Sequence, residues 1–597
     1  MEHDISFFKC ETDQRYKYAR RALVLDRVIE GHWFISQSPL LQLPTDMLTD
    51  IVDLLADDKP ALASLALVNK TCRQLARSSQ FAEVVFDYSP RAYHLLFRLT
   101  TEANSRTRSQ QQPPTIGACI RKFTVKGSPE RPGVFENFNY TGQSQSSSMW
   151  SINQNLKFLP ALLHESVLPH ALPNLQFAVW SSTECLDEKF LGFMTRSATK
   201  LRVWKSAKAG VDVSALLQEE LSVPGTISSR FYDRLFRACA PTLESLNWHD
   251  IHGKHGPSVS YDNDIISFPK LRFLSIDVIK IPPHIFSSFL RAPLRHLSLP
   301  RLLESDVMGE ALANCNLIQS LETLVIWSMR SSKKNAAHIA SFIERHEHIE
   351  KLYVQEFDWI HGESARIVPY IIPVLSEGNF KNLKSLSLGF GLGGVEEENM
   401  REELVSIPGR SLRVVGGLTS LEQLHLSAGE YYGWRHQWLI DHDKLRVALR
   451  HLKRLRKLAF SRDTYEDDGT SSTQGYYLSR ICSVNVRLEA MSRPDLEDNL
   501  EDLAWLGIQE DNTAANHHKR KELWERAHRN RMLIHAENYA AVLPALEWMY
   551  LGQRAISIQS DPNDPGRRMA LPLTNSREQF SEYLYDMFAM GGGRQGI

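Results

Sequence analysis

The sequence has no long hydrophobic run, and this absence limits the classes of protein to which the chain can belong. No stretch approaches the roughly 18 consecutive apolar residues of a membrane-spanning helix. The N-terminal segment, MEHDISFFKCETDQRYK, is polar and mixed in charge, without the basic-then-apolar order of a secretory signal peptide. We therefore expect no membrane association and a cytoplasmic or nuclear location.

Cysteine is scarce, and neither sign of charge is in excess. The closest of the seven cysteines, Cys72 and Cys119, are 47 positions apart. This spacing excludes Cys-x-x-Cys zinc motifs, argues against a disulfide framework and favours a reducing compartment. The chain has 69 basic and 70 acidic side chains and a formal charge of −1. No overall charge therefore attracts nucleic acid or an anionic membrane.

Catalytic motifs are also missing. The sequence contains neither His-Glu-x-x-His nor Gly-x-Ser-x-Gly. His249, His252 and His255 recur every third residue, but the intervening glycines are more typical of a polar loop than of a zinc site. The glycine-rich stretch 389–394 lacks the Lys-Ser/Thr of a phosphate loop, which favours a turn between repeats. We expect no catalytic site, no cofactor and no metal site.

The stretch from Leu41 to Phe81 predicts three short helices. The first carries an apolar stripe at helical spacing, with a second stripe beside it formed by Met47 and Leu54. Asp58-Lys59-Pro60 separates the first helix from the second, and Asn69 is a suitable N-cap for the third. Two interpretations stay open on this pattern. The helices form either a small cap on the next domain or a docking face for a second protein.

This stretch resembles an F-box. The resemblance lies in a leading Leu43-Pro44, an apolar first helix, an Asp-led second helix rich in Leu, and Val68-Asn69-Lys70 before Leu75-Ala76. Asp46 stands where the family often has Glu, and Thr71-Cys72-Arg73 where it often has Trp or Arg. The resemblance implies that the segment binds a Skp-type adaptor. The implied contact residues are Leu43, Pro44, Met47, Leu48, Ile51, Leu54, Leu55, Leu62, Leu65 and Val68.

From residue 120 onward one sequence pattern recurs, which we call the repeated phrase. It consists of an apolar residue, any two residues, an apolar residue, any one residue and a third apolar residue. It begins at Ile120, Leu175, Leu243, Leu271, Leu294, Leu321, Ile349, Leu383, Leu421, Leu455 and Leu546. From Leu243 to Ile349 its steps are 28, 23, 27 and 28 residues, within the period of about 20–29 residues typical of leucine-rich repeats. Later steps of 34, 38, 34 and 91 residues indicate insertions. The strands of an ordinary α/β sheet would be fuller apolar runs.

The predicted fold is α/β: a three-helix module followed by an irregular solenoid, with a curved parallel sheet and outer helices. We expect an N-terminal helical extension at 1–38, the F-box at 39–82, the solenoid with insertions at 83–560, and a C-terminal tail with one short helix at 561–597. Helices are predicted at 16–30, 92–99, 285–291, 338–345, 445–453, 515–543 and 576–590, a strand at 84–88 and an exposed loop at 101–114.

Residues between the apolar positions of each phrase are predicted to face outward from the concave side of the sheet. Several are aromatic, as in partner-binding surfaces. The same side chains would be hidden if the chain's own insertions covered them, and both interpretations stay open. The aromatic insertion 431–438 is a further candidate, either as a ligand anchor or as local packing. The candidate residues are Phe273, His296, Trp327, Tyr353, His425, Tyr431 and Trp434.

An F-box followed by leucine-rich repeats resembles the F-box/leucine-rich-repeat proteins, especially the long, irregular ones of filamentous fungi. The resemblance implies the substrate-recognition subunit of a Skp-cullin-F-box ubiquitin ligase. The F-box would dock the adaptor and so a cullin-RING ligase, and the repeats would hold a protein substrate marked for degradation. The alternative is an interaction scaffold outside any ligase, with a degenerate F-box. Neither implies binding to nucleic acid or membrane.

Overall fold

The computed structural model describes most of the chain in a set of separate ranges. One or two residues are left out at a few places inside these ranges. These ranges are 23–28, 39–106, 115–127, 172–182, 203–206, 236–250, 265–299, 306–326, 332–356, 366–391, 406–429, 438–464, 488–496 and 514–573, with Leu584 and Phe588. Contacts divide the chain into an N-terminal unit, Phe8–Ser298, and a C-terminal unit, Leu299–Ile597. Each unit is described by itself.

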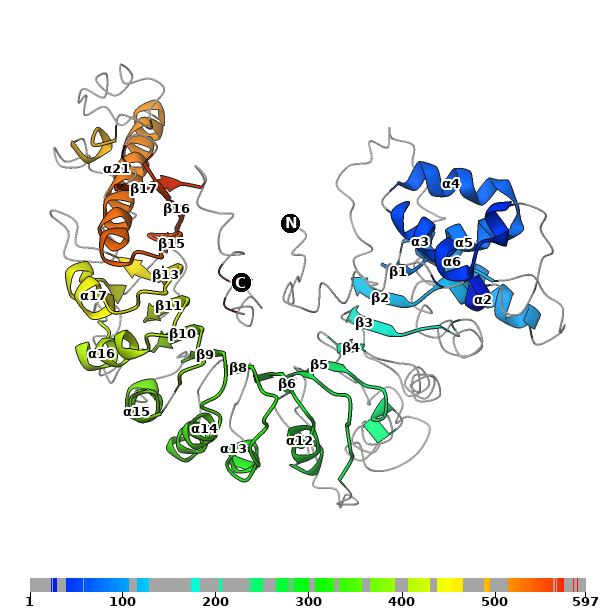
Figure 1. The fold of residues 1–597 in the computed structure, drawn as a ribbon, viewed down its shortest axis with the longest axis horizontal. Coiled ribbons are helices and arrows are strands. Elements are labelled where there is room, and N and C mark those ends of the chain that lie inside the picture. The colour runs from blue at the N-terminus through cyan, green and yellow to red at the C-terminus, as the bar shows by residue number, and fades with distance from the viewer. Residues whose placement is uncertain are drawn as a thin grey trace. The chain divides into compact units, whose positions relative to one another are not determined.

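Three consecutive helices open the N-terminal unit, as predicted: α3 (Thr45–Leu54), α4 (Lys59–Val68) and α5 (Lys70–Gln80) (Figure 1). The Asp58 carboxylate accepts a hydrogen bond from the Ala61 N–H at 2.9 Å, and the Asn69 side chain accepts one from the Cys72 N–H at 2.8 Å. Each side chain satisfies an N–H that the first turn of a helix leaves without a partner. These caps fix where α4 and α5 begin.

The three-helix module has one shared core. Leu48, Val52 and Leu62 pack in it with Leu75 and Ala76. The short helix α2 (Leu25–Val28) adds Leu25 and Val28, so the described part of the predicted helix 16–30 packs against this module. Cys119, just ahead of the second strand, lies in the same core, and the Gln74 side-chain amide donates to the Thr115 carbonyl at 2.7 Å. The module and the first repeat therefore share a core.

Parallel strands follow in chain order in the N-terminal unit, and the predicted strand at 84–88 forms β1. The strands are β1 (Glu83–Phe86), β2 (Lys122–Gly127), β3 (Phe177–Ser182), β4 (Val203–Ser206), β5 (Ser245–Asp250), β6 (Phe273–Val278) and β7 (His296–Leu299). The helices are α6 (Pro90–Arg106), the 3-10 turns η1 (Pro39–Gln42) and η2 (Gly117–Cys119), and α12 (Pro283–Leu290). The predicted loop at 101–114 is wrong in its first part, because α6 continues to Arg106.

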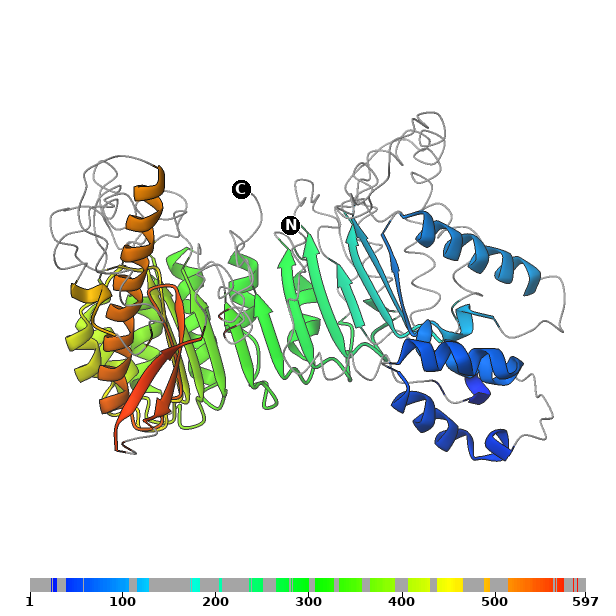
Figure 2. The same ribbon diagram turned by 90° about the horizontal axis from the view of Figure 1, so that it is seen from above.

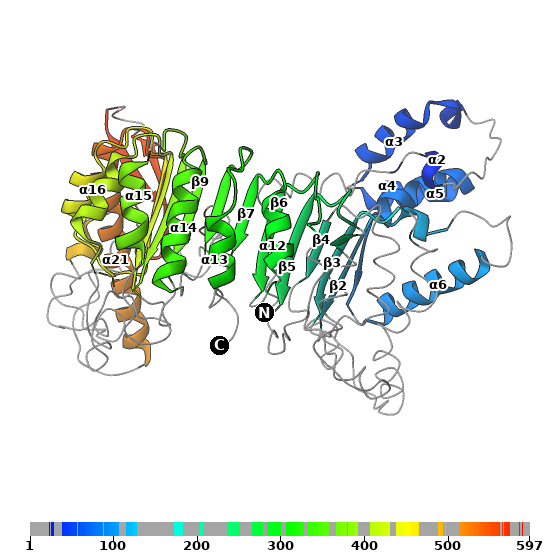
Figure 3. The same cartoon turned by 90° about the horizontal axis from the view of Figure 1, so that it is seen from below.

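The C-terminal unit alternates strands and helices. Its parallel strands are β8 (Thr323–Ile326), β9 (Lys351–Gln355), β10 (Ser385–Phe390), β11 (Gln423–Ala428), β13 (Lys457–Ser461) and β15 (Trp548–Leu551). Its helices are α13 (Asp306–Ala313), α14 (Lys333–Arg345), the π-helix η5 (Ile367–Ile371), α15 (Ile372–Glu377), α16 (Gly409–Gly417) and α17 (His442–Leu449). These helices lie side by side on one face of the sheet (Figure 3).

The repeated phrase forms the core of this unit because its middle apolar residues share one register row. Leu324 pairs with Leu352, which pairs with Leu386, and the row continues through β11, β13 and β15. All six side chains in the row are fully buried. Each strand–helix pair has too little core alone, so stacked neighbours bury the row together.

The end of the described chain departs from the repeat. The long helix α21 (Ala514–Val542) precedes β15, as predicted, and β16 (Arg554–Ser560) and β17 (Arg568–Pro572) then pair antiparallel (Figure 2). The turn residues Gly552 and Gln553 both have positive φ. A two-residue β-hairpin loop with a type I′ turn requires this conformation at both positions. The prediction of a tail with frayed ends from residue 561 is therefore wrong over Arg568–Pro572, which forms an edge strand.

The structure is mixed α/β with a sheet rich in parallel strands, and it resembles a leucine-rich-repeat solenoid. The prediction of fold class is confirmed at this level. A second, two-stranded sheet pairs β12 (Trp438–Leu439) with β14 (Asp463–Thr464) inside the late insertions. Within the described ranges, no helix combines the length and apolar character needed to cross a membrane.

Candidate protein-interaction surfaces

The three-helix module exposes large apolar side chains on α3 and α4. Met47 is 51% exposed and Leu54 87%, while Leu67 and Val68 at the end of α4 are 79% and 65% exposed. Met47 and Leu54 are seven residues apart, which places them on one side of α3, away from the buried stripe of Leu48 and Val52. Single exposed apolar residues are common, but four on two short neighbouring helices mark a candidate contact surface.

The predicted adaptor-binding residues divide into two groups. Met47, Leu54 and Val68 are exposed with Pro44, whereas Leu43, Ile51, Leu55 and Leu65 are half-buried. Leu48 and Leu62 are 2% and 1% exposed within the module's core. The prediction of direct partner contact is therefore corrected for these two residues, because they hold the helices together. Leu67 was not predicted, although its place next to Val68 on an Asp-led, Leu-rich helix was a usable signal.

The predicted substrate-binding residues lie apart from one another. Phe273 and His296 are register partners on β6 and β7 of the N-terminal unit, with ring centroids 6.3 Å apart. Tyr353 and His425 lie in the C-terminal unit on β9 and β11. All four are buried, so none is an exposed contact residue in this structure. Trp327, Tyr431 and Trp434 lie outside the described residues.

The ring of Phe588, near the end of the chain, packs against Tyr353 and His425. The ring of Phe588 lies 6.1 Å from that of Tyr353, nearly perpendicular, and 5.3 Å from that of His425. His425 Nδ1 is 2.7 Å from the Ser387 hydroxyl and its Nε2 is 2.9 Å from the Ser461 hydroxyl. Burial and the nearby Arg462 guanidinium lower the pKa of His425 to about 3, so this imidazole is neutral. The pair is hidden, as the second interpretation above expected, but by Phe588 near the end of the chain and not by an insertion.

Trp438, at the end of the aromatic insertion, is part of the local packing. It is buried, and its ring meets that of Phe460 at 90° with centroids 5.5 Å apart. This arrangement is the edge-to-face geometry that aromatic pairs prefer. The local-packing interpretation therefore holds for Trp438, while residues 430–437 lie outside the described part of the chain.

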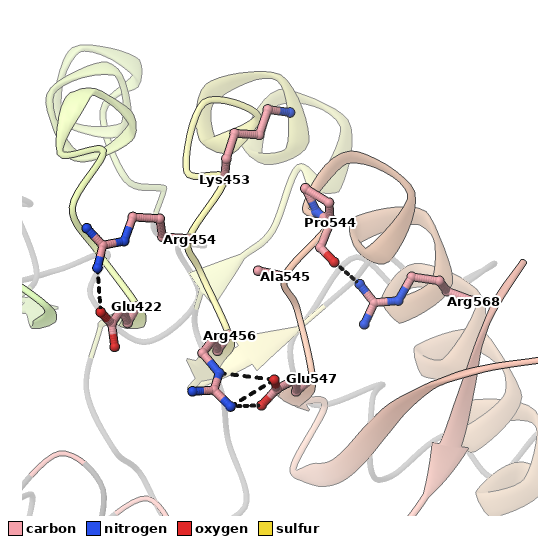
Figure 4. A pocket seen from close by; sticks show the side chains of 8 residues that line it. All are labelled: Glu422, Lys453, Arg454, Arg456, Pro544, Ala545, Glu547 and Arg568. Atoms are coloured by element: carbon pink, nitrogen blue, oxygen red, sulfur yellow. Dashed lines mark hydrogen bonds and ion pairs between the residues drawn. The ribbon is translucent and has the colours of Figure 1, made fainter. Parts of the chain in front are cut away.

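A charged row borders the strands of the C-terminal unit. The residues just before β9, β10, β11, β13 and β15 alternate in sign: Glu350, Lys384, Glu422, Arg456 and Glu547. Their backbones are linked in sequence by N–H to carbonyl hydrogen bonds of 2.8 Å. Lys384 pairs with Glu350 at 2.9 Å. Arg456 binds both oxygens of Glu547 at 3.0 and 2.9 Å (Figure 4). We call these five residues the charge row.

A pocket of about 450 Å³ lies beside the charge row, and its cations all have partners within the chain (Figure 4). Arg454 pairs with Glu422 at 2.9 Å, and Arg568 donates to the Pro544 carbonyl at 2.5 Å. Lys453 donates to the Val542 carbonyl at 3.2 Å. Because these donors are already engaged, the pocket is poorly suited to an anionic ligand.

The glycine-rich stretch also has an internal partner. The Gly391 N–H donates to the Glu356 carboxylate at 2.7 Å, and the same carboxylate accepts from the N–H groups of Arg366, at 2.5 Å, and Ile367. The buried Glu356 therefore occupies the place that a phosphate would take at such N–H groups. Gly389 belongs to β10, and residues 392–394 lie outside the described part of the chain, so the predicted turn between repeats stays a prediction. Among the described residues no group of three or more potential metal ligands is gathered.

Comparison with known proteins does not identify the family of this chain. No protein family matches the sequence. No curated protein matches it either. Among solved structures, an internalin from Listeria monocytogenes matches with 13% identity and a TM-score of 0.27, over 62% of this chain and 82% of that chain. A similarity of this size assigns neither the fold nor the function.

Proposed function

We propose that this chain is the substrate-recognition subunit of a Skp-cullin-F-box type ubiquitin ligase. The three-helix module docks a Skp-type adaptor, and the repeats hold the protein substrate. The chain does no chemistry itself, but raises the concentration of substrate beside the ubiquitin donor. The proposal rests on the resemblance of residues 41–81 to an F-box and on the repeat fold that follows.

The observation that carries the proposal is the exposure of Met47, Leu54, Leu67 and Val68 on a module whose core is otherwise closed. Burying one leucine contributes about 1.5–3 kcal/mol. Burial of several such side chains against a partner with a matching apolar surface would therefore favour binding.

The test is direct binding of a purified Skp-type adaptor to the full chain and to the double variant Leu54→Asp/Leu67→Asp. Both side chains are exposed, so the fold should persist. Removing two apolar contacts should weaken binding by about a hundredfold or more, since ~1.4 kcal/mol is tenfold. Isothermal titration calorimetry measures both affinities.

Val447→Asp is the matched control, because Val447 is 62% exposed on α17, outside the module. It should bind the adaptor like the parent. If the parent does not bind a Skp-type adaptor, or the double variant binds as tightly as the parent, the proposal is wrong and the scaffold alternative takes its place.

A further inference from the structure

The strand β17 forms an edge of the sheet in the C-terminal unit. Among the described strands it pairs with β16 and with no other. The Leu573 N–H, just after β17, donates to the Ala555 carbonyl of β16 at 3.0 Å. Residues of an antiparallel strand direct their hydrogen-bonding groups to alternate sides, so Arg568, Ala570 and Pro572 direct theirs away from β16. An edge of this kind is a template for pairing with another strand.

The groups that such a strand would need are already engaged or missing. Pro572 has no backbone N–H to donate, a common way of blunting an edge strand. The Ala570 N–H donates to the Glu537 carboxylate at 3.2 Å. The Ala570 carbonyl accepts from Nη1 and Nη2 of Arg493, each at 3.4 Å. Side chains therefore satisfy both hydrogen-bonding groups of Ala570, which is fully buried.

The two side chains that engage Ala570 also bind each other. The Arg493 guanidinium lies 2.9 Å from the Glu537 carboxylate, and the two side chains are 10% and 23% exposed. Arg493 follows a short helical turn at 488–490, whereas Glu537 lies on α21. The carboxylate accepts where the carbonyl of a neighbouring strand would accept, and the guanidinium donates where its N–H would donate. We call Arg493 and Glu537 the edge pair.

A second ion pair joins the same two elements. Arg531 on α21 binds both oxygens of Glu489, at 2.7 to 3.1 Å. The Asn530 side-chain amide donates to the carbonyls of Glu489 and Ala490 at 2.9 and 3.0 Å. These contacts lie about 9 Å further back along the axis of α21 than Glu537. They hold the helical turn on α21, so the edge pair is not needed for that attachment alone.

The sequence of β17 is compatible with pairing to a second copy of itself. In an antiparallel pair related by a two-fold axis at Ala570, the two copies of Ala570 would exchange their N–H and C=O groups. Arg568 would then oppose Pro572, so like charges would not meet. Met569 would oppose Leu571, which gives two apolar cross-strand contacts. Since Pro572 cannot donate, Ala570 is the central position of this pairing.

We propose that the edge pair blocks a second copy of this chain from pairing with β17, and so keeps the protein monomeric. The edge pair occupies both groups of the one residue on which the pairing is centred. A second strand would have to displace an ion pair whose members are mostly buried. The inference does not depend on the proposed function, because the edge pair belongs to the C-terminal unit and the three-helix module to the N-terminal unit.

The test compares the parent with Arg493→Ala/Glu537→Ala by sedimentation velocity over a range of micromolar concentrations. The parent should sediment as a monomer of 68.2 kDa. The double variant frees both groups of Ala570, so its apparent mass should rise with concentration toward twice that of the parent. Glu489→Ala/Arg531→Ala is the matched control, because it removes an ion pair between the same two elements. The control should remain a monomer.

A third substitution tests whether the association uses β17. Adding Ala570→Pro to the double variant removes the N–H that faces away from β16, so the triple variant should be a monomer again. The hairpin of β16 and β17 should persist, because proline is tolerated on an edge strand where no ladder bond is lost. In the parent, hydrogen exchange reports the contact itself. The Ala570 amide should exchange roughly tenfold more slowly in the parent than in Glu537→Ala.

A double variant that is folded by circular dichroism and stays monomeric would overturn the proposal. A dimeric parent would also overturn it, as would association of the matched control to the same extent as the double variant. Dimers that survive Ala570→Pro would place the contact elsewhere and reject β17 as the pairing edge. Equal exchange of the Ala570 amide in the parent and in Glu537→Ala would show that the edge is not closed in solution, even if the double variant does not fold.

Discussion

Four histidines in the C-terminal unit stay neutral in the folded chain, His346 and His425 buried and His442 and His535 half-buried. Burial is the main cause in each case and lowers the pKa of His346 and His535 to about 4, and of His425 and His442 to about 3. His442 on α17 and His535 on α21 stack with ring centroids 3.9 Å apart, and the His442 Nδ1 lies 3.2 Å from the Tyr539 hydroxyl. These contacts join the long helix to the repeats.

We predict that acid destabilises the C-terminal unit through these histidines. Their folded pKa values lie below the ordinary value of about 6.5, so the unfolded chain takes up protons first as the pH falls. Each histidine then removes up to ~1.4 kcal/mol per pH unit between pH 6.5 and its folded pKa. Urea unfolding at pH 7, 6 and 5 measures the loss.

The variant His535→Leu should be less acid-sensitive than the parent, by up to ~1.4 kcal/mol per pH unit. The charges that face the His442–His535 pair, Asp441, Asp443, Arg446 and Arg531, are unchanged in it. His451→Gln, at an exposed histidine, is the control and should keep the parent's pH dependence. Identical slopes for His535→Leu and the parent would show that these contacts do not set the acid response.

At the scale of single elements, the charge row favours the same register of neighbouring strands as the buried Leu row. A shift of one strand by one position would break both the alternation of sign and the buried Leu row, so the two rows favour the same pairing. Exposed ion pairs contribute little individually, about 0–1 kcal/mol, and salt screens them. Their role is therefore one of specificity more than of stability.

We predict that Lys384→Glu destabilises the C-terminal unit by ~0.5–1 kcal/mol at low salt, since Glu350 and Glu422 would then flank a third carboxylate. The loss should shrink in 0.5 M salt. Lys381→Glu, at an exposed lysine three positions earlier, should have no comparable effect. Chemical denaturation at two salt concentrations checks both, and a salt-independent loss in Lys384→Glu would contradict the electrostatic explanation.

The strands that the repeated phrase predicted are present. The strands β4, β16 and β17 were not predicted because their sequences depart from the phrase. β4 has Ser206 where the phrase needs an apolar residue. β16 and β17 run antiparallel after the Gly552-Gln553 turn, and Gly-Gln is a weak hairpin signal. Tyr353 and His425 were predicted as candidate contact residues, but the sequence did not show that Phe588 lies against them. The spacing of Leu584 and Phe588 predicts a helical face, but local pattern does not say which distant surface that face covers.

At the scale of the whole chain, apolar side chains gather at two places that belong to different units and differ in exposure. The three-helix module keeps its apolar residues exposed, and its core is complete without a partner. In the C-terminal unit, Val325, Tyr353, Ala459 and Tyr550 are buried in one cluster with Leu584 and Phe588.

The measurement that tests this account most directly is assembly of the full chain with a purified Skp-type adaptor and a cullin, followed by mass photometry. We predict a single complex with one copy of each protein, which includes the 68.2 kDa of this chain. The variant Leu54→Asp/Leu67→Asp should remain at the mass of the free chain, and Val447→Asp should assemble like the parent. A parent chain that stays free at micromolar concentrations of adaptor and cullin would contradict the account.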